Sequence, residues 1–191
     1  MPVLHVVAGP NGAGKSTFVA RILQPVTFLP FVNADEIAAA RWPEDPMRHA
    51  AEASQAAAEE RAALLAARSS FITETVFSHE SKVALISDAS KAGYLVTLHV
   101  VMVPAALPIA RVAHRVRFGG HDVPEEKVRA RYARLWPLVA QAVECADAAV
   151  FYDNSLASQP FRRVATFRHG RAIEPPEWPA WTPLAIRALS G

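Results

Sequence analysis

Hydrophobic positions along the chain gather into five short runs, rich in β-branched residues, and each run ends at a polar or glycine-rich turn. Such runs are typical of buried strands. They lie at residues 3–8, 28–32, 70–73, 94–103 and 148–152. The run at 94–103 scarcely alternates between apolar and polar residues, which indicates a strand that is covered on both faces of its sheet.

Segments with helical spacing separate these runs. The predicted helices span residues 16–23, 46–68, 82–91, 107–117 and 124–146. Because these connections are long enough for crossover helices, we expect a mostly parallel, five-stranded sheet with helices on both faces, which is the α/β class. Residues 161–169 and 172–173 predict a small hairpin around Gly170, and a proline-rich tail follows to residue 191.

Composition and charge narrow the class of protein. The chain has 191 residues, of which 51% are apolar and 20% charged, so it is not a disordered chain. We expect one domain over residues 1–191, with a core at about 3–155 and the hairpin and tail at about 160–191. The net charge of +2 offers no basic stripe for nucleic acid, and no segment has the ~18 clean apolar residues of a membrane span. The single cysteine, Cys145, has no partner for an internal disulfide and indicates a reducing, cytoplasmic setting.

The turn after the first predicted strand carries a phosphate-binding motif. It reads Gly9, Pro10, Asn11, Gly12, Ala13, Gly14, Lys15, Ser16, followed by Thr17. The glycines let backbone N–H groups curl around phosphate oxygens, Lys15 reaches the β- and γ-phosphates, and the Ser16 hydroxyl is the expected Mg²⁺ ligand. We therefore expect residues 9–17, called the P-loop below, to bind ATP or GTP with Mg²⁺. The same string is common in ABC transporter ATPases, but this chain lacks their Leu-Ser-Gly-Gly-Gln signature.

Polar residues follow the next two predicted strands, at the edge where such sheets bind ligands. Asp35 is placed to take the proton of an acceptor hydroxyl, and capping of the following helix is the alternative. Glu74 is a candidate for holding a magnesium-bound water or a substrate hydroxyl, with a solvated strand-end acid as the alternative. Asn33 and Thr75 are candidate substrate contacts, although Asn33 equally suits a turn.

A group of arginines precedes a candidate lid. Arg115 and Arg117 share a predicted helix, ahead of two glycines at 119–120 and His121. Phosphoryl transfer needs positive charge around the transferred group, so we expect at least one of these arginines to be catalytic and the glycines to act as a hinge. A solvated arginine-rich helix face is the alternative. Arg131, in the next predicted helix, is interpreted as a surface charge.

In this order, the motifs resemble the zeta-toxin family of P-loop kinases, and more closely its stand-alone branch described as predicted ABC-type ATPases. The resemblance rests on residues 9–17, 32–35, 71–78, 111–124 and 152–155. It implies a kinase that uses ATP or GTP. Zeta toxins phosphorylate the 3′-hydroxyl of the amino sugar in UDP-N-acetylglucosamine, and a small helical antitoxin blocks their nucleotide site, which implies a possible antitoxin partner here.

By position, the resemblance also implies roles for single residues. Lys15 and Ser16 would hold the triphosphate and Mg²⁺, and Asp35 would be the base. Glu74 and Thr75 would contact the substrate, and Arg115 would lie beside the transferred phosphate. The chain departs from the family in its lid, where His121 stands in place of a second phosphate-facing arginine, and in its shorter substrate-binding insertions.

The leading hypothesis is a small-molecule kinase that moves the γ-phosphoryl group of Mg-ATP to a sugar hydroxyl, with a UDP-amino sugar as one acceptor. In it, Asp35 activates the hydroxyl, while Lys15 and Arg115, together with Arg117 and His121, stabilise the transferred group. The alternative is a nucleotide-controlled binding switch with slow hydrolysis and a protein partner. A kinase for polynucleotide ends is disfavoured by the nearly neutral charge.

Overall fold

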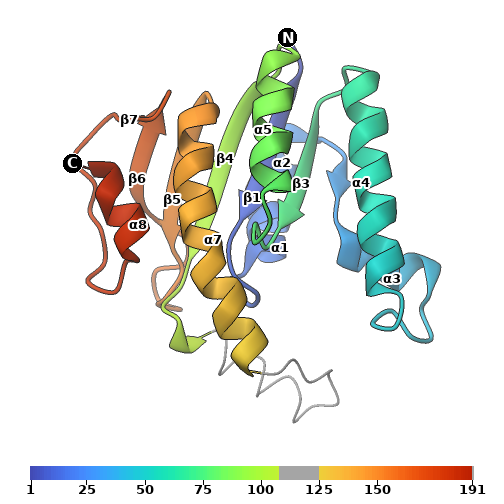
Figure 1. Cartoon of the computed structure of the whole chain (residues 1–191), viewed down its shortest axis with the longest axis horizontal. Helices are drawn as coiled ribbons and strands as arrows, with labels where there is room; N and C mark the ends of the chain where they lie inside the picture. Colours follow the sequence, from blue (N-terminus) through green and yellow to red (C-terminus); the bar gives the residue numbers. More distant parts are fainter. Residues whose placement is uncertain (108–124, 191) are drawn as a thin grey trace.

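The computed structural model describes residues 1–107 and 125–190, and a mixed β-sheet forms its centre (Figure 1). Within these residues the sheet has seven strands in the order β2-β3-β1-β4-β5-β6-β7. The strands are β1 (Val3–Ala8), β2 (Phe31–Val32), β3 (Phe71–Thr75), β4 (Leu95–Met102), β5 (Ala148–Asp153), β6 (Arg162–Arg168) and β7 (Arg171–Ala172). Neighbouring strands from β2 to β5 pair in parallel, whereas β6 and β7 each pair antiparallel to the strand before them.

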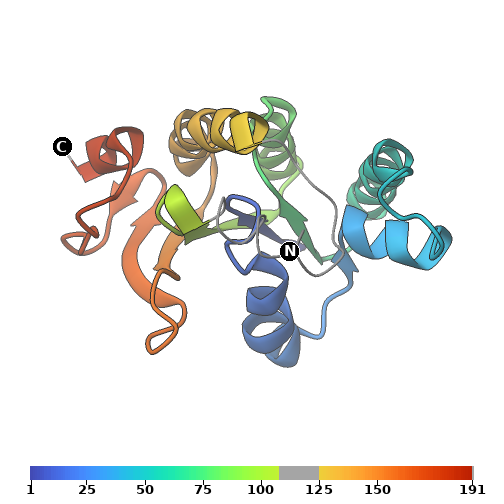
Figure 2. The same ribbon diagram turned by 90° about the horizontal axis from the view of Figure 1, so that it is seen from below.

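Helices cover both faces of this sheet, as the sequence predicted. They are α1 (Lys15–Phe18), the π-helical turn η1 (Val19–Leu23), α2 (Gln24–Thr27), α3 (Ala34–Arg41), α4 (Ala50–Ala66), α5 (Ser81–Lys91), α7 (Glu125–Cys145), α8 (Leu184–Arg187) and the 3-10 turn η2 (Ala188–Ser190). Seen from below, α5 and α7 lie over one face of the sheet, and the run from α1 to α2 lies under the other (Figure 2). The predicted α/β class is therefore confirmed.

The prediction of five strands was wrong, because the C-terminal hairpin joins the main sheet. β6 pairs along β5, from Ala148 opposite Arg168 to Asp153 opposite Arg162. Val164 of β6 is buried beside this ladder. Adding a strand to an existing sheet satisfies backbone groups and buries apolar side chains, whereas an isolated hairpin is marginally stable at best. The hairpin therefore extends the sheet instead of standing apart.

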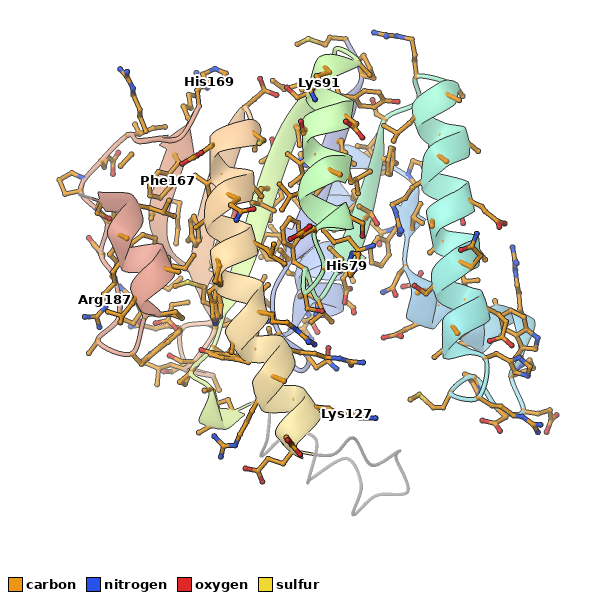
Figure 3. The ribbon with its side chains drawn as sticks, viewed as in Figure 1. His79, Lys91, Lys127, Phe167, His169 and Arg187 are labelled. Carbon is orange, nitrogen blue, oxygen red and sulfur yellow. The ribbon has the colours of Figure 1, made fainter. Side chains whose placement is uncertain are left out.

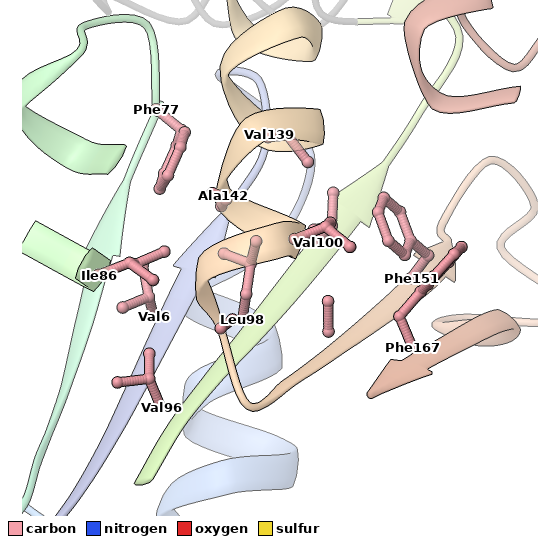
Figure 4. Packing of buried hydrophobic residues seen from close by; sticks show 14 of the residues in the cluster. Val6, Phe77, Ile86, Val96, Leu98, Val100, Val139, Ala142, Phe151 and Phe167 are labelled. Carbon is pink, nitrogen blue, oxygen red and sulfur yellow. The ribbon is translucent and has the colours of Figure 1, made fainter. Parts of the chain in front are cut away.

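Successive residues of β1 belong to two different hydrophobic clusters, one on each face of the sheet. Val6 belongs to the larger cluster, together with Leu98 of β4 and Val139 of α7 (Figure 4). Val7 belongs to a smaller cluster on the opposite face, where it packs with Phe18 of α1. This division follows from the two-residue period of a strand, which sends successive side chains to opposite faces. β1 is thus covered on both sides, and it carries the P-loop at its end.

Two histidines of the neighbouring strands β1 and β4 contact each other, and His99 is the buried one. The Nδ1 atom of His5 lies 3.0 Å from Nε2 of His99, and Nδ1 of His99 lies 3.3 Å from the Tyr152 hydroxyl oxygen. Phe18 packs against the rings of both His99 and Tyr152. Burial, together with the charge of His5 when protonated, lowers the pKa of His99 from 6.5 to about 3. His99 is therefore neutral in the folded protein at ordinary pH.

Several boundaries differ from the prediction. The first helix continues past residue 23 through η1 and α2 and ends at Phe28, which has a φ of 55°. The second strand is consequently only β2, and the helix that Asp35 was considered to cap is α3, which already begins at Ala34. The helix predicted from residue 46 begins at Ala50. Most of the helix predicted at 107–117 lies outside the described residues.

Candidate active site

Glycines give the P-loop a backbone path that other residues would obstruct. A Cβ atom on Gly9 would lie 2.4 Å from the carbonyl oxygen of Val101, and one on Gly14 would lie 2.7 Å from Nδ2 of Asn154. Gly14 also has a φ of 93°, in the left-handed region that favours glycine. The amide of Asn154 donates a 2.8 Å hydrogen bond to the Ala13 carbonyl oxygen. The loop is therefore pressed against the ends of β4 and β5, with its backbone in the curled form that a phosphate needs.

The Lys15 ammonium group lies inside this curl. Its side chain is buried, and Nζ donates a 3.2 Å hydrogen bond to the Pro10 carbonyl oxygen. The same atom lies 3.5 Å from Oε1 of Glu74. Burial lowers the pKa of Lys15 below 10.5, while the nearby carboxylates of Glu74 and Asp35 act in the opposite direction. The ammonium group is thus held in place by a backbone oxygen and a carboxylate before any phosphate binds.

The Glu74 carboxylate joins three segments of the site. Glu74 is the last residue but one of β3, the strand beside β1, and is in register with Val7. Its Oε2 atom accepts a 2.7 Å hydrogen bond from the Ser16 hydroxyl and a 3.2 Å hydrogen bond from Nδ2 of Asn33. With the Lys15 contact on Oε1, both of its oxygens are engaged. Glu74 is therefore a largely buried connector between β3, the P-loop and the start of α3, not a solvated strand-end acid.

Asn33, not Asp35, caps α3. The Oδ1 atom of Asn33 accepts a 2.8 Å hydrogen bond from the Asp35 backbone N–H. The alternative of Asp35 as the helix cap was therefore wrong. Asn33 is better suited because it precedes the helix in an extended conformation, whereas Asp35 already lies in its first turn. This arrangement leaves the exposed Asp35 carboxylate without a capping role.

A cavity of about 270 Å³ lies beside Asp35 and Glu74. Residues from the ends of β2 and β3 and from the four helices α3, α4, α5 and α7 line it: Asn33, Ala34, Asp35, Ser54, Ala57, Arg61, Glu74, Thr75, Val76, Ser78, Lys82 and Arg131. Thr75, a candidate substrate contact, lines this cavity, and its Oγ1 atom also accepts a 3.1 Å hydrogen bond from the Phe77 N–H. A space of this kind beside the P-loop can receive a second substrate.

The structure brings together most of the residues that the sequence singled out. Lys15 and Ser16 meet Glu74 directly, and Asn33, Asp35, Glu74 and Thr75 share the cavity wall. Three further predicted residues lie outside the described part of the chain: Arg115, Arg117 and His121.

Sequence reasoning missed basic residues of the cavity. It passed over Arg61 and Lys82, and it assigned Arg131 to the surface, although Arg131 lines the cavity while staying exposed. One usable signal was the spacing of Ser54, Ala57 and Arg61, which places small residues and an arginine on one helix face.

Two negative findings concern the described residues. Across 1–107 and 125–190, no group of three or more His, Cys, Asp and Glu residues is placed to hold a metal ion by itself. Over the same ranges, the helices are too short or too polar to span a bilayer. A magnesium site built from one protein hydroxyl plus phosphate and water oxygens would not form such a group.

Sequence comparison gives the family. Residues 4–138 match the AAA_33 model, an AAA domain family. The chain belongs to the AAA_33 family. This match covers most of the chain, including β1, the P-loop, β3 and part of α7. No curated protein matches this family member in sequence.

Solved structures similar to this AAA_33 domain include proteins described as kinases or toxins. A kinase candidate from Chloroflexus aurantiacus has a TM-score of 0.64 at 17% identity, over 83% of this chain and 91% of that chain. The complex of AvrRxo1-ORF1 with AvrRxo1-ORF2, solved with ATP, gives 0.66 at 16% identity, over 90% of this chain and 60% of that chain. The PezAT toxin–antitoxin system of Streptococcus pneumoniae gives 0.55 at 12% identity, over 80% and 68%. At these identities the likeness shows the fold alone, an α/β P-loop NTPase-like domain.

Proposed function

We propose that this chain is a magnesium-dependent kinase that transfers the γ-phosphoryl group of ATP or GTP to a hydroxyl of a small molecule. A sugar hydroxyl is the proposed acceptor, and a UDP-amino sugar such as UDP-N-acetylglucosamine is one candidate. The observation that carries this proposal is the convergence of Lys15, Ser16 and Asn33 on Glu74, next to the cavity that Asp35 lines. Phosphoryl transfer requires this combination of a phosphate cradle and an adjoining acceptor space.

The residues of the P-loop fit a bound triphosphate. The close approaches at Gly9 and Gly14 leave no room for side chains, and the buried Lys15 ammonium group lies inside the loop. In the proposal, residues 9–17 bind the phosphates, and Lys15 places a positive charge beside the transferred group. Arg115 and Arg117 remain sequence-based candidates for adding to that charge.

The Ser16 hydroxyl fits a magnesium ligand, and its geometry also suggests the role of Glu74. Magnesium prefers oxygen ligands, keeps several waters, and would neutralise phosphate charge when bound. Because Glu74 accepts the hydrogen bond of Ser16, its carboxylate is placed to orient that hydroxyl and to accept hydrogen bonds from metal-bound water. The sequence left two roles open for Glu74, which are to hold a magnesium-bound water or to hold a substrate hydroxyl. The hydrogen bond from Ser16 favours the first role.

Asp35 is the proposed base. Its exposed carboxylate lines the cavity and has no helix-capping role. A carboxylate there can orient an acceptor hydroxyl and accept its proton while the hydroxyl oxygen bonds to the transferred phosphorus. Asn33, which anchors the first turn of α3 through the Asp35 N–H, would keep this carboxylate close to the P-loop.

Phosphorus NMR tests the proposal. The protein is incubated with Mg-ATP, with and without UDP-N-acetylglucosamine and a panel of sugars. We expect a new phosphomonoester signal with an acceptor and little ATP loss without one. Asp35→Asn should abolish transfer while ATP affinity stays within a few-fold of the original value. Asp88→Asn, which changes an exposed aspartate on α5, is the matched control and should leave transfer intact.

A protein partner is a second proposal. One similar structure is the complex of AvrRxo1-ORF1 with AvrRxo1-ORF2, and another comes from the PezAT toxin–antitoxin system. An antitoxin would inhibit the kinase, whereas the partner of a nucleotide-controlled switch would accelerate hydrolysis. Stoichiometry separates the two functions, because a kinase yields one phosphorylated acceptor for each ATP consumed. Slow ATP loss without a phosphorylated acceptor would favour the switch.

A further inference from the structure

The cavity beside Asp35 has a basic wall. Arg61 comes from α4, Lys82 from the first turn of α5 and Arg131 from α7, so three separate helices bring cations to one space. Within residues 1–107 and 125–190, none of these three side chains takes part in a hydrogen bond or ion pair. Asp35 and Glu74 lie on the same cavity wall, but Glu74 is engaged by Lys15 and Ser16. Among the described residues, these three cations therefore have no acidic partner in contact with them.

Arg61 is the most deeply buried of these three cations. Only 9% of its surface is exposed, so nine-tenths of a charged side chain is buried while it lines the cavity. Burying a charge without a partner is costly, and buried guanidinium groups are normally paired. Burial lowers the pKa of Arg61, and the acid that opposes this shift is its chain neighbour Glu60, which is exposed.

Lys82 lies close enough to Arg61 to be affected by its charge. Burial lowers the pKa of Lys82, and the positive charge of Arg61 lowers it further. Two cations that repel each other on the wall of one cavity are both stabilised when an anion binds between them. A guanidinium group can bind phosphate or carboxylate through two parallel hydrogen bonds, and an ammonium group adds a compact charge.

The face of α4 leaves room for such a group. Ser54 and Ala57 lie on the same side of the helix as Arg61 and also line the cavity. Their short side chains leave open space in front of the guanidinium group. The volume of about 270 Å³ approaches the lower end of the ~300–1,000 Å³ range of small-molecule pockets.

We propose that the acceptor carries an anionic group, a phosphate or a carboxylate, which Arg61 and Lys82 bind while the acceptor hydroxyl lies at Asp35. This inference rests on the proposed kinase function and specifies the class of its acceptor. Sugar phosphates, sugar acids and nucleotide sugars belong to this class, whereas neutral sugars and polyols do not. The pocket is thereby divided into a carboxylate side, which takes the hydroxyl, and a cationic side, which takes the anion.

Paired acceptors test the proposal in the full-length protein. Initial rates of transfer from Mg-ATP are compared for glucose, glucose 6-phosphate and gluconate, and for N-acetylglucosamine and its 1-phosphate. We expect kcat/KM to be at least about tenfold higher for an anionic member than for its neutral partner, which corresponds to about 1.4 kcal/mol. The phosphate and carboxylate members show which anion the site prefers.

Variants connect this preference to the basic wall. Arg61→Gln should raise KM for the anionic acceptor at least about tenfold, with KM for Mg-ATP unchanged within about twofold, and Arg61→Lys should restore part of the loss. Lys82→Gln should act in the same direction, and it keeps the test decisive if Arg61→Gln does not fold. Lys91→Gln is the matched control, because Lys91 lies at the other end of α5 and is exposed (Figure 3).

A binding measurement separates this inference from the kinase proposal. Inorganic phosphate and glucose 6-phosphate are titrated into protein whose P-loop is saturated with a non-hydrolysable Mg-ATP analogue. Heat of binding that is lost in Arg61→Gln and Lys82→Gln supports the anion site, even if no acceptor is ever phosphorylated. Transfer to neutral acceptors with equal efficiency, or anion binding that both variants retain, would overturn the anion site while leaving the kinase intact.

Discussion

The Ser16 hydroxyl donates a 2.7 Å hydrogen bond to Oε2 of Glu74, across 58 positions of the chain. The same carboxylate holds the Lys15 ammonium group and the amide of Asn33. The two P-loop side chains that the proposal assigns to phosphate and magnesium are thus positioned by one strand-end acid. This arrangement makes Glu74 the residue whose change should reveal most about the site.

Glu74→Gln should lower kcat at least about tenfold, in the range found when groups that orient a metal ligand are replaced. The amide keeps the shape of the side chain but loses the negative charge. In the carboxylate this charge faces Lys15 and strengthens the hydrogen bond that Ser16 donates. Steady-state rates at several magnesium concentrations measure the effect, and a higher magnesium requirement is expected. Glu80→Gln, at an exposed acid just before α5, is the control. A normal rate and magnesium dependence in Glu74→Gln would contradict the proposed role.

Lys15→Ala should weaken ATP binding and lower turnover about hundredfold or more, because a buried charge beside the phosphates is removed. It also leaves Glu74 without its cation. Calorimetric titration with an ATP analogue and rate measurements check both effects. Lys91→Ala, at an exposed position, should change neither. Unchanged turnover in Lys15→Ala would refute the P-loop assignment.

Gly9→Ala should destabilise the fold by more than about 2 kcal/mol, since the new Cβ would lie 2.4 Å from the Val101 carbonyl oxygen and the backbone must move. Gly93→Ala provides a comparison. At Gly93 the φ of 81° is strained for alanine, but the nearest atom is the end of the Arg68 side chain at 3.5 Å. We expect about 1 kcal/mol there. Urea unfolding of both variants measures the difference, and equal losses would show that the close contact at Gly9 is easily relieved.

Acid should destabilise the protein through His99. Its pKa is about 3 in the folded protein and about 6.5 when unfolded, so between these values the unfolded chain binds one proton more. The contribution is fully present above pH ~6.5 and is lost as the pH falls toward 3. Between about pH 7.5 and pH 5.5 the wild type should lose about 1.4 kcal/mol more of its unfolding free energy than His99→Gln does.

Urea midpoints of the wild type and His99→Gln at both pH values check this difference. His169→Asn replaces an exposed histidine and should follow the wild type. If His99→Gln and the wild type lost equal stability, His99 would not be the buried neutral histidine that its contacts with His5 and Tyr152 indicate.

The P-loop and the strand-end residues could be predicted because their signals are local. A glycine-rich turn between a strand and a helix specifies its own backbone, and the strand ends of a parallel sheet meet at one edge. The position of Glu74 beside Ser16 follows from these rules. The capping role of Asn33 was missed because two nearby polar residues, Asn33 and Asp35, both suit a helix start.

Arg61 and the extra strands depend on tertiary packing, so the local pattern could not give them. Arg61 lies in α4, an alanine- and glutamate-rich helix whose charged residues resemble a solvated face. Its burial beside the cavity results from where α4 packs in the folded protein. Likewise, the turn at Gly170 predicts a hairpin, but the choice of β5 as its partner is made by the buried face of the sheet. Burial and partner choice are properties of the assembled fold.

The two edge strands of the sheet, β2 and β7, are only two residues long. Their length affects whether copies of this protein can pair through their sheet edges. Continuous strand edges recruit other chains, and short or covered edges prevent this recruitment. Beyond β7 the tail continues to shield β6, through hydrogen bonds from the Ile173 and Glu177 N–H groups to the Thr166 and Val164 carbonyl oxygens. The C-terminal segment therefore keeps β6 from pairing with other chains. In a chain cut after His169, the edge of β6 would be exposed and could pair with a strand of another molecule.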